Sequence, residues 1–182
     1  SISSRILNVL YETPKEFRML ITLALKPHIG ISGIPFIKRK IFEELVVFFE
    51  ESVFTRIKVM KEESKPEDFP GQLIALVLKF CETNKGFSRI LTREVFTADE
   101  VKIIDKVSNC FEKINIEIRQ SLQEYERTTK KKLNLNLAAS CDLLLSCLEG
   151  QIQSFVRSKF KKDLSGSWED QWNFLKKAIF AN

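Results

Sequence analysis

Apolar residues recur every three or four positions along most of the chain, which is the spacing of amphipathic α-helices. The longest such pattern predicts one helix from Ile37 to about Lys61. Its apolar stripe consists of Phe42, Leu45, Val46, Phe49, Val53, Phe54 and Ile57. No segment alternates between apolar and polar residues as a half-buried strand does. The pattern therefore predicts an all-α protein.

Shorter helical patterns follow this long helix. Residues 63–71 contain two prolines and are expected to form a loop. The next helix, Gln72 to about Asn84, is apolar around much of its circumference, as is typical of a central helix. Gly86 is read as the stop of that helix, and a short helix is expected from Phe87 to about Arg93.

Three polar residues mark the starts of the last helices. Thr97 forms a capping box with Glu100 and opens a long helix that runs to about Arg127. Asn136 is expected to cap the next helix, and Ser167 to open the last one.

The N-terminal part is built from shorter elements. A helix is expected over residues 3–12, and Thr13 with Pro14 begins another. Pro27 ends or kinks this second helix, and residues 28–36 are rich in turns. We therefore expect a small helical head, residues 1–36, on a larger helical body, residues 37–182.

Composition limits the chemistry that the chain can perform. The four cysteines form no C-x-x-C pair, and the single histidine, His28, lies far from them, so a zinc site is not expected. Each cysteine lies in an apolar helical pattern, which predicts buried, reduced thiols in a reducing cytoplasm. They are Cys81, Cys110, Cys141 and Cys147.

Common catalytic and membrane-spanning patterns are missing from the sequence. No apolar run reaches the roughly 18 residues that a membrane span needs. With one histidine and no glycine-rich phosphate-binding motif, the sequence favours a protein that is not an enzyme and has no cofactor or metal. The net charge of +5 is compatible with binding to nucleic acid, although each short basic cluster taken alone reads as a solvated surface.

The segment "ITLALKPHIGIS", Ile21 to Ser32, resembles the helix-turn-helix of the TetR family. Gly30 permits the sharp turn, and Ser32 caps the recognition helix. The resemblance implies that this head binds DNA. The candidate contacts to phosphates or base edges are Thr22, Lys26, His28, Ser32, Lys38 and Arg39.

The head departs from the family pattern after Ser32. The family expects about nine further residues of recognition helix, but only residues 33–36 precede the long helix. Gly33 and Pro35 both oppose a helix there. Either the head is degenerate or residues are absent from this sequence.

The body carries the more specific resemblance. The segments "FEELVVFFEESVFTRI", "ETNKGFSRILT", "CFEKINIEIRQSLQE" and "LEGQIQSFVRSKFKKD" occur in order between Phe42 and the C-terminus, and they resemble the nucleoid-occlusion factors of the TetR family. The resemblance implies a cytoplasmic, nucleoid-associated homodimer that binds a near-palindromic DNA site. It also implies binding to the C-terminal tail of FtsZ, which blocks assembly of the division ring over the chromosome.

The same resemblance implies a groove for the FtsZ tail between the long helix and the next body helix. Phe48, Arg56, Leu76 and Asn84 match its positions, and their chemistry provides apolar anchorage and a cation for an acidic tail. A place in the core is the other interpretation of Phe48 and Leu76, because both lie on apolar helices.

Two positions in the groove depart from the family. A groove glycine is Lys79 here, and a groove arginine is Thr83. We expect these changes to alter the affinity or the orientation of the tail.

The dimer face is expected on the last two helices. Gly150 sits inside a helix, where it costs about 1 kcal/mol relative to Ala. Close approach of a second copy would explain this glycine, and a helix bend is the alternative. The residues expected at the interface are Leu144, Leu148, Gly150, Ile152, Phe155 and Trp172.

Two other functions fit parts of the pattern. A TetR-type transcriptional repressor would hold a small apolar ligand in a cavity lined by Phe80, Phe111 and Leu144. A helical dimer that has lost DNA binding would explain the shortened head.

Overall fold

A computed structural model describes residues 35–96 and 101–180, with the side chains described from Phe42 onward. These residues form six α-helices, and their only β-type pairing is an isolated bridge between Leu133 and Phe180. The prediction of an all-α protein is therefore confirmed over this part of the chain. The helices are α3 (Pro35–Glu63), α4 (Phe69–Thr83), α5 (Lys85–Leu91), α6 (Val101–Thr129), α7 (Leu137–Arg157) and α8 (Trp168–Ile179).

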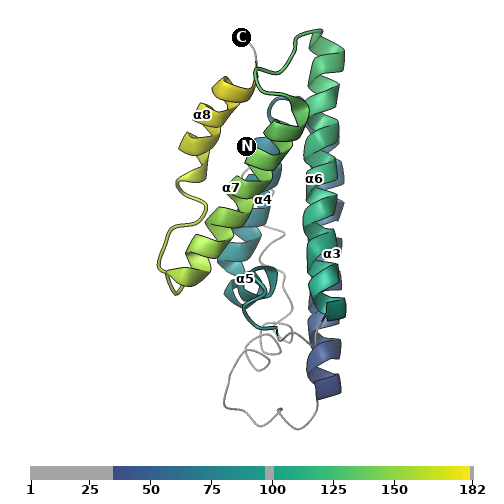
Figure 1. Ribbon diagram of the computed structural model, residues 1–182, viewed down its shortest axis with the longest axis vertical. Helices are drawn as coiled ribbons and strands as arrows, with labels where there is room; N and C mark the ends of the chain where they lie inside the picture. The colour runs from purple at the N-terminus through teal and green to yellow at the C-terminus, as the bar shows by residue number, and fades with distance from the viewer. Residues whose placement is uncertain (1–34, 97–100, 181–182) are drawn as a thin grey trace.

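Helix α4 lies at the centre of the body. It contacts all five of the other described helices, as its nearly continuous apolar sequence predicted. The long helices α3 and α6 run side by side along one side, and α7 and α8 lie on the other side (Figure 1). Both long helices point in the same direction, and α7 runs back against them (Figure 1). The helical body is thus built in layers around α4.

The apolar stripe of α3 forms one wall of the core. Phe42, Leu45, Val46, Phe49, Val53 and Ile57 are at most 1% exposed. At the centre of this wall, the Phe49 ring stacks on Phe87 at 4.8 Å and meets the edge of Phe80 at 5.2 Å between ring centroids. Such ring pairs each contribute about 0.5–1.5 kcal/mol beyond the burial of their area. This cluster fixes α3 against α4 and α5.

The last helix is held to α4 by the two tryptophans of the chain. Trp168 Nε1 donates a hydrogen bond to the backbone oxygen of Gly71 at 2.9 Å. The Lys176 ammonium pairs with the Asp68 carboxylate, near the start of α4. At the other end of α8, Asn134 N donates to Ile179 O at 2.8 Å, which ties the α6–α7 link to the C-terminal segment.

Several helix boundaries differ from those predicted. Helix α3 begins at Pro35 rather than Ile37, and α4 begins at Phe69, inside the predicted loop. Pro70 lies in the first turn of α4, where its missing N–H has no helical partner to lose. Gly86 does not stop a helix but lies within α5. The head elements and the capping box of Thr97 and Glu100 lie outside the described residues.

Two predicted helix starts can be compared directly. The Asn136 side chain accepts a hydrogen bond from Ala139 N at 2.9 Å, so the predicted cap of α7 is confirmed. Ser167 directly precedes α8 as predicted, but its side chain makes no capping bond. It accepts a hydrogen bond from the side-chain nitrogen of Gln171 instead.

The cysteines follow the prediction of buried thiols, except that Cys147 is only half buried. All four are free, and burial raises the pKa of Cys81 and of Cys110 to about 12. None of the helices described here is both long enough and apolar enough to cross a membrane.

Candidate functional site

The surface where α3 meets α4 carries the residues expected to bind a partner. We call it the α3–α4 face and define it by Phe48, Arg56, Leu76, Lys79 and Thr83. The Phe48 side chain is partly buried, and its ring centroid lies 6.3 Å from that of Phe80. Phe48 therefore belongs partly to the core and partly to the surface, between the two interpretations of the sequence.

Arg56 occupies an unusual environment on this face. Its side chain is half buried, and the Nη1 atom is buried without a hydrogen-bond partner among the described residues. Burial lowers the pKa of the guanidinium from its ordinary value. A buried donor without a partner costs about 1–3 kcal/mol, and more when it carries a charge. Arg56 is thus a cation whose bonding capacity is not used within this part of the protein.

Leu76 and Asn84 are placed more deeply. Leu76 is 2% exposed and Asn84 is 6% exposed, so neither offers much surface to a partner. The Asn84 side-chain nitrogen donates to Phe80 O at 2.9 Å, and the Asn84 backbone N–H donates to the same oxygen at 2.9 Å. Asn84 therefore closes the end of α4 and separates it from α5. These two residues can shape the face, whereas Phe48 and Arg56 retain accessible surface on it.

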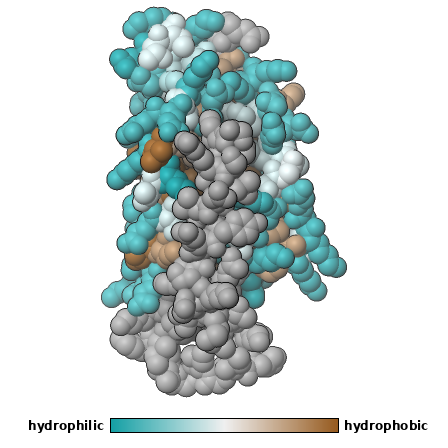
Figure 2. All heavy atoms as spheres, turned by 180° about the vertical axis from the view of Figure 1, so that it is seen from behind, coloured by the Kyte–Doolittle hydropathy of each residue, from teal (hydrophilic) through white to brown (hydrophobic). Residues whose placement is uncertain are grey.

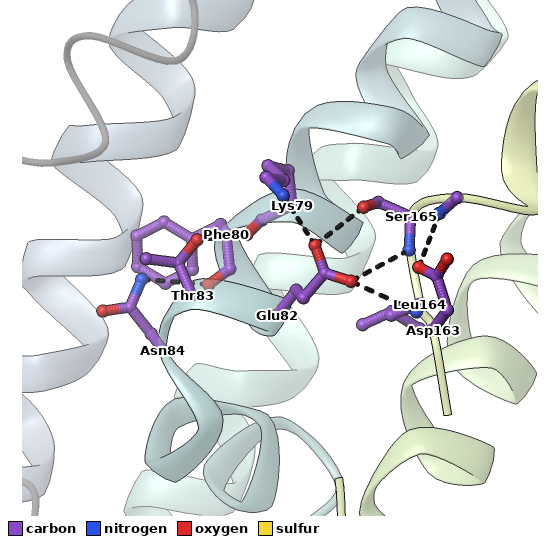
Figure 3. A network of polar contacts seen from close by, with 9 residues as sticks. Lys79, Phe80, Glu82, Thr83, Asn84, Asp163, Leu164 and Ser165 are labelled. Carbon is purple, nitrogen blue, oxygen red and sulfur yellow. Dashed lines mark hydrogen bonds and ion pairs between the residues drawn. The ribbon is translucent and has the colours of Figure 1, made fainter. Parts of the chain in front are cut away.

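Lys79 is joined to a polar network that begins with Glu82 (Figure 3). One carboxylate oxygen of Glu82 accepts from Lys79 Nζ and from Ser165 Oγ, both at 2.7 Å. The other oxygen faces the backbone N–H of Leu164 at 3.3 Å. Burial alone would raise the pKa of Glu82, but the bonds from Lys79 and Ser165 and the charge of Lys79 outweigh it and hold the pKa at about 2.

This network links the α3–α4 face to the connection between α7 and α8. Leu164 and Ser165 lie in that connection, more than eighty residues from Glu82 along the chain. One turn away, Thr83 Oγ1 donates to Lys79 O at 2.9 Å and remains exposed. The site residues expected from the sequence did not include Glu82, because nothing local in the sequence indicates its distant partners.

Most of the residues expected at the dimer interface are buried within one copy of the chain. Four of them, Leu144, Leu148, Ile152 and Phe155, are at most 1% exposed within this chain alone. Helix α7 turns them toward α4, α5 and α6, so they belong to the core of one copy and present no surface to another. Trp172 is also buried, against Gly71.

The outer side of α7 and α8 carries different residues. Gly150 is exposed, and a β-carbon added to it would meet nothing within 4 Å. Leu143 on α7 is 38% exposed and Phe174 on α8 is 75% exposed, the highest value among the large apolar side chains described. The opposite side of the molecule, seen from behind in Figure 2, is mainly hydrophilic outside its grey residues, with apolar residues in small separate spots. Any dimer seam on the last two helices must therefore use these exposed positions.

The candidate DNA contacts are not tested by the structure. Thr22, Lys26, His28 and Ser32 lie outside the described residues. Lys38 and Arg39 lie in the first turns of α3, and their side chains are not described.

The ligand cavity of the alternative repressor function can be examined at its three residues. Phe80 and Leu144 are buried in the core, and Phe111 is partly buried on α6. Phe80 is packed against the rings of Phe48, Phe49 and Phe87. Aromatic side chains thus fill the space around Phe80. A ligand would need that space if Phe80 lined a cavity.

Known proteins resemble this chain over most of its length. The SlmA-like family profile, described as a tetracyclin repressor-like C-terminal domain, matches residues 71–179. The nucleoid occlusion factor SlmA of Shewanella pealeana is 35% identical over 143 residues, which cover 78% of this chain and 73% of that protein. The chain belongs to the SlmA-like family. Nucleoid occlusion factor SlmA of a Marinomonas species is 30% identical over 167 residues, covering 88% of this SlmA-like chain and 85% of its relative.

A solved structure supports the fold of the SlmA-like chain. The transcriptional regulator FadR of Bacillus subtilis, crystallised with stearoyl-CoA, superposes with a TM-score of 0.61 over 79% of this chain and 77% of FadR. At 14% sequence identity this likeness shows the TetR-type fold alone. The family and the fold together favour a DNA-binding regulator resembling SlmA over the two alternative functions. The relatives bear the names of regulators, not of enzymes.

Proposed function

We propose that this chain is a nucleoid-associated, cytoplasmic homodimer that binds DNA through residues 1–36 and inhibits FtsZ ring assembly through its body, residues 37–182. It acts by binding and has no catalytic activity. One observation carries the proposal: the buried Nη1 atom of Arg56 has no hydrogen-bond partner among the described residues. Arg56 lies on the face that the resemblance assigns to the FtsZ tail. An acidic peptide would bring a carboxylate to the half-exposed Arg56 side chain, and a rotation of that side chain would let its Nη1 donate to it.

The geometry of the α3–α4 face suits a short acidic peptide with apolar side chains. Arg56 presents a planar group that can bind a carboxylate through two N–H donors. Phe48 offers a ring that is supported from behind by Phe80, and such rigid aromatic anchors carry much of the energy in peptide recognition. Lys79 adds a second cation on α4, and its ammonium is paired with the Glu82 carboxylate.

The two departures from the family on α4 compensate each other in charge. The chain has Thr83 where its relatives are expected to have an arginine, but it has Lys79 in place of a glycine. Positions four residues apart lie on the same face of a helix. This chain therefore has its cation one turn earlier on α4 than its relatives are expected to have it, and still on the α3–α4 face. We therefore propose that the acidic tail still binds here, with its carboxylates shifted toward Lys79.

In the proposed dimer, two heads bind the two halves of a near-palindromic DNA site. Thr22, Lys26, His28 and Ser32 would contact bases or phosphates, and Lys38 and Arg39 would contact phosphates at the start of α3. The symmetric seam would lie on the outer side of α7 and α8, around Leu143, Gly150 and Phe174, because the inner residues are already buried.

The proposal is tested by titrating labelled DNA and an FtsZ C-terminal peptide, separately and together, at two salt concentrations. Arg56→Gln should weaken peptide binding about tenfold or more, the range for a charge-assisted bond. Lys58→Gln, an exposed cation on the same helix, should have little effect. Peptide binding that ignores the Arg56 substitution would refute the site.

The same titration separates the two rival functions. A ligand-responsive repressor would bind DNA but not the peptide. A dimer that no longer binds DNA would bind the peptide alone.

A further inference from the structure

The connection that follows α7 is strongly basic. We call residues 157–162 the basic connection; it contains Arg157, Lys159, Lys161 and Lys162, and all four side chains are exposed. None of them forms an ion pair with any residue that the structure describes. Arg157, in the last turn of α7, is favourable at a helix C-terminus. The three lysines that follow lie beyond the end of the helix and have no such explanation.

The basic connection is held in a fixed shape. The backbone N–H of Phe160 donates to Phe155 O at 3.0 Å, and the two rings meet edge to face at 5.2 Å. Lys159 and Phe160 adopt the left-handed region, with φ of 55° and 62°, which costs a non-glycine residue about 1–2 kcal/mol. Just beyond, Leu164 is fully buried and bonded to Glu82. The four cations are thus displayed on an ordered surface.

The position of this surface relates it to the head. Residues 1–34 join the body at Pro35, where α3 begins. Helix α7 runs toward that end of the body, so the basic connection lies toward the same end as the start of α3 (Figure 1). The α6–α7 link, which carries the other described lysine cluster, lies at the opposite end.

The chemistry of the surface distinguishes between two classes of anionic partner. The aromatic ring of the connection, Phe160, packs onto Phe155 and is only partly exposed. A bound peptide gains most of its affinity from a few buried apolar or aromatic anchors. A DNA backbone needs only cations, because it carries one negative charge about every 1.7 Å along the duplex axis. A surface that presents four exposed cations and only part of one ring therefore favours phosphates.

We infer that the basic connection is a second DNA-binding surface, in which Arg157, Lys159 and Lys161 bind the phosphate backbone independently of sequence. This inference rests on the proposed DNA binding by the head, and it adds a contribution from the body. The head would choose the site, while the body would strengthen attachment to any duplex. Binding of these cations to phosphates releases counterions from the DNA. The contribution of the basic connection must therefore appear in the salt dependence of DNA affinity.

The test uses the full chain and a labelled duplex of mixed sequence, about 30 base pairs long, as a probe for phosphate binding alone. The test variant is Arg157→Gln, Lys159→Gln and Lys161→Gln together; Lys162 is kept because it donates to Gln151 and Ser154. The matched control is Lys130→Gln, Lys131→Gln and Lys177→Gln, which removes three exposed cations at the other end of the body. Affinity is measured by anisotropy between about 50 and 200 mM salt.

The test variant should bind about tenfold more weakly at the lowest salt. The slope of log K against log salt should decrease by about 0.9 for each phosphate that the variant no longer neutralises. The control should change both quantities much less, and the charge-preserving variant Lys159→Arg and Lys161→Arg should bind as the original does. If the slope of log K against log salt is the same for the test variant and the control, the inference is wrong. This holds even if both variants bind DNA more weakly than the original.

Two further outcomes separate this inference from the proposed function. If the unaltered chain binds no duplex at any salt, then DNA binding by the head and by the body both fail. If the test variant loses binding to a polyglutamate peptide but not to DNA, the surface is a peptide site and the inference is wrong. Binding of the FtsZ peptide should be the same in the test variant as in the original, because Arg56 and Phe48 are unchanged.

Discussion

The indole of Trp172 lies so close to Gly71 that a β-carbon placed on Gly71 would be 2.2 Å from its Cε2 atom. The neighbouring Trp168 donates its indole N–H to the Gly71 backbone oxygen, and the two indoles stack at an angle of 26° with centroids 6.3 Å apart. The absence of a side chain at Gly71, in the first turn of α4, thus lets α8 pack closely against α4. The contact joins two segments that lie about one hundred residues apart in the sequence.

Gly71→Ala should destabilise the body, because the methyl group has no room unless Trp172 moves. Overpacking of this kind costs about 1–3 kcal/mol, or roughly 2–4 °C in Tm per kcal/mol in a protein of this size. Thermal and urea unfolding would measure the loss. Gly150→Ala is the matched control, since its new methyl group meets no atom within 4 Å and should not lower stability within one copy. An unchanged Tm in Gly71→Ala would show that Trp172 does not pack tightly against residue 71.

Glu82→Gln should lower stability at neutral pH by about 1–2 kcal/mol, which allows for partial screening by solvent. The folded-state pKa of about 2 lies below the ordinary value of 4.5, so the carboxylate stabilises the fold above pH 4.5 and loses this effect as the pH falls toward 2. The gap between the original and the variant should therefore close on acidification. Urea unfolding at several pH values would measure it.

Glu112→Gln is the control for this pH dependence, because its carboxylate is exposed in the middle of α6, away from the helix ends. It should follow the original protein across the whole range. A gap between Glu82→Gln and the original that is as large at about pH 2.5 as at neutral pH would contradict the assigned role of the carboxylate.

The helices were predictable because their signals are local. The stripe of α3 and the Asn136 cap each depend on residues within a few turns, and both appear as predicted. Gly71 was assigned to a loop because the reason for its presence, Trp172, is distant in sequence. The hydrogen bond from Ser165 to Glu82 was not predicted for the same reason.

The individual residues of a dimer face are hard to predict for a different physical reason. An apolar stripe shows that a side of a helix is buried, but it does not show which partner buries it. Leu144 and Leu148 are buried by helices of the same chain, not by a second copy. The positions left for a second copy, such as Phe174, are isolated apolar residues among polar ones, which periodicity does not distinguish from ordinary surface.

Phe174→Ser should weaken the proposed dimer without unfolding the chain. The side chain is 75% exposed in one copy, so its removal takes little from the core. At a symmetric seam it is removed twice, and we expect the dimer dissociation constant to rise at least about tenfold. Sedimentation across a dilution series would measure this rise. Val59→Ser, at an exposed apolar position on α3, should leave the dimer unchanged; equal behaviour of the two variants would exclude Phe174 from the seam.

Lys79→Ala should weaken binding of the acidic FtsZ peptide, and adding Thr83→Arg to it should restore the affinity. The reason is that residues 79 and 83 lie one turn apart on α4, so either can place a cation on the α3–α4 face. We expect a loss of about three- to tenfold for the single substitution, the range of one partly exposed ion pair. Peptide anisotropy would measure it, with the exposed Lys85→Ala on α5 as control. A double variant as weak as the single one would show that the cation has not simply moved along the helix, and that Lys79 acts through its pair with Glu82 instead.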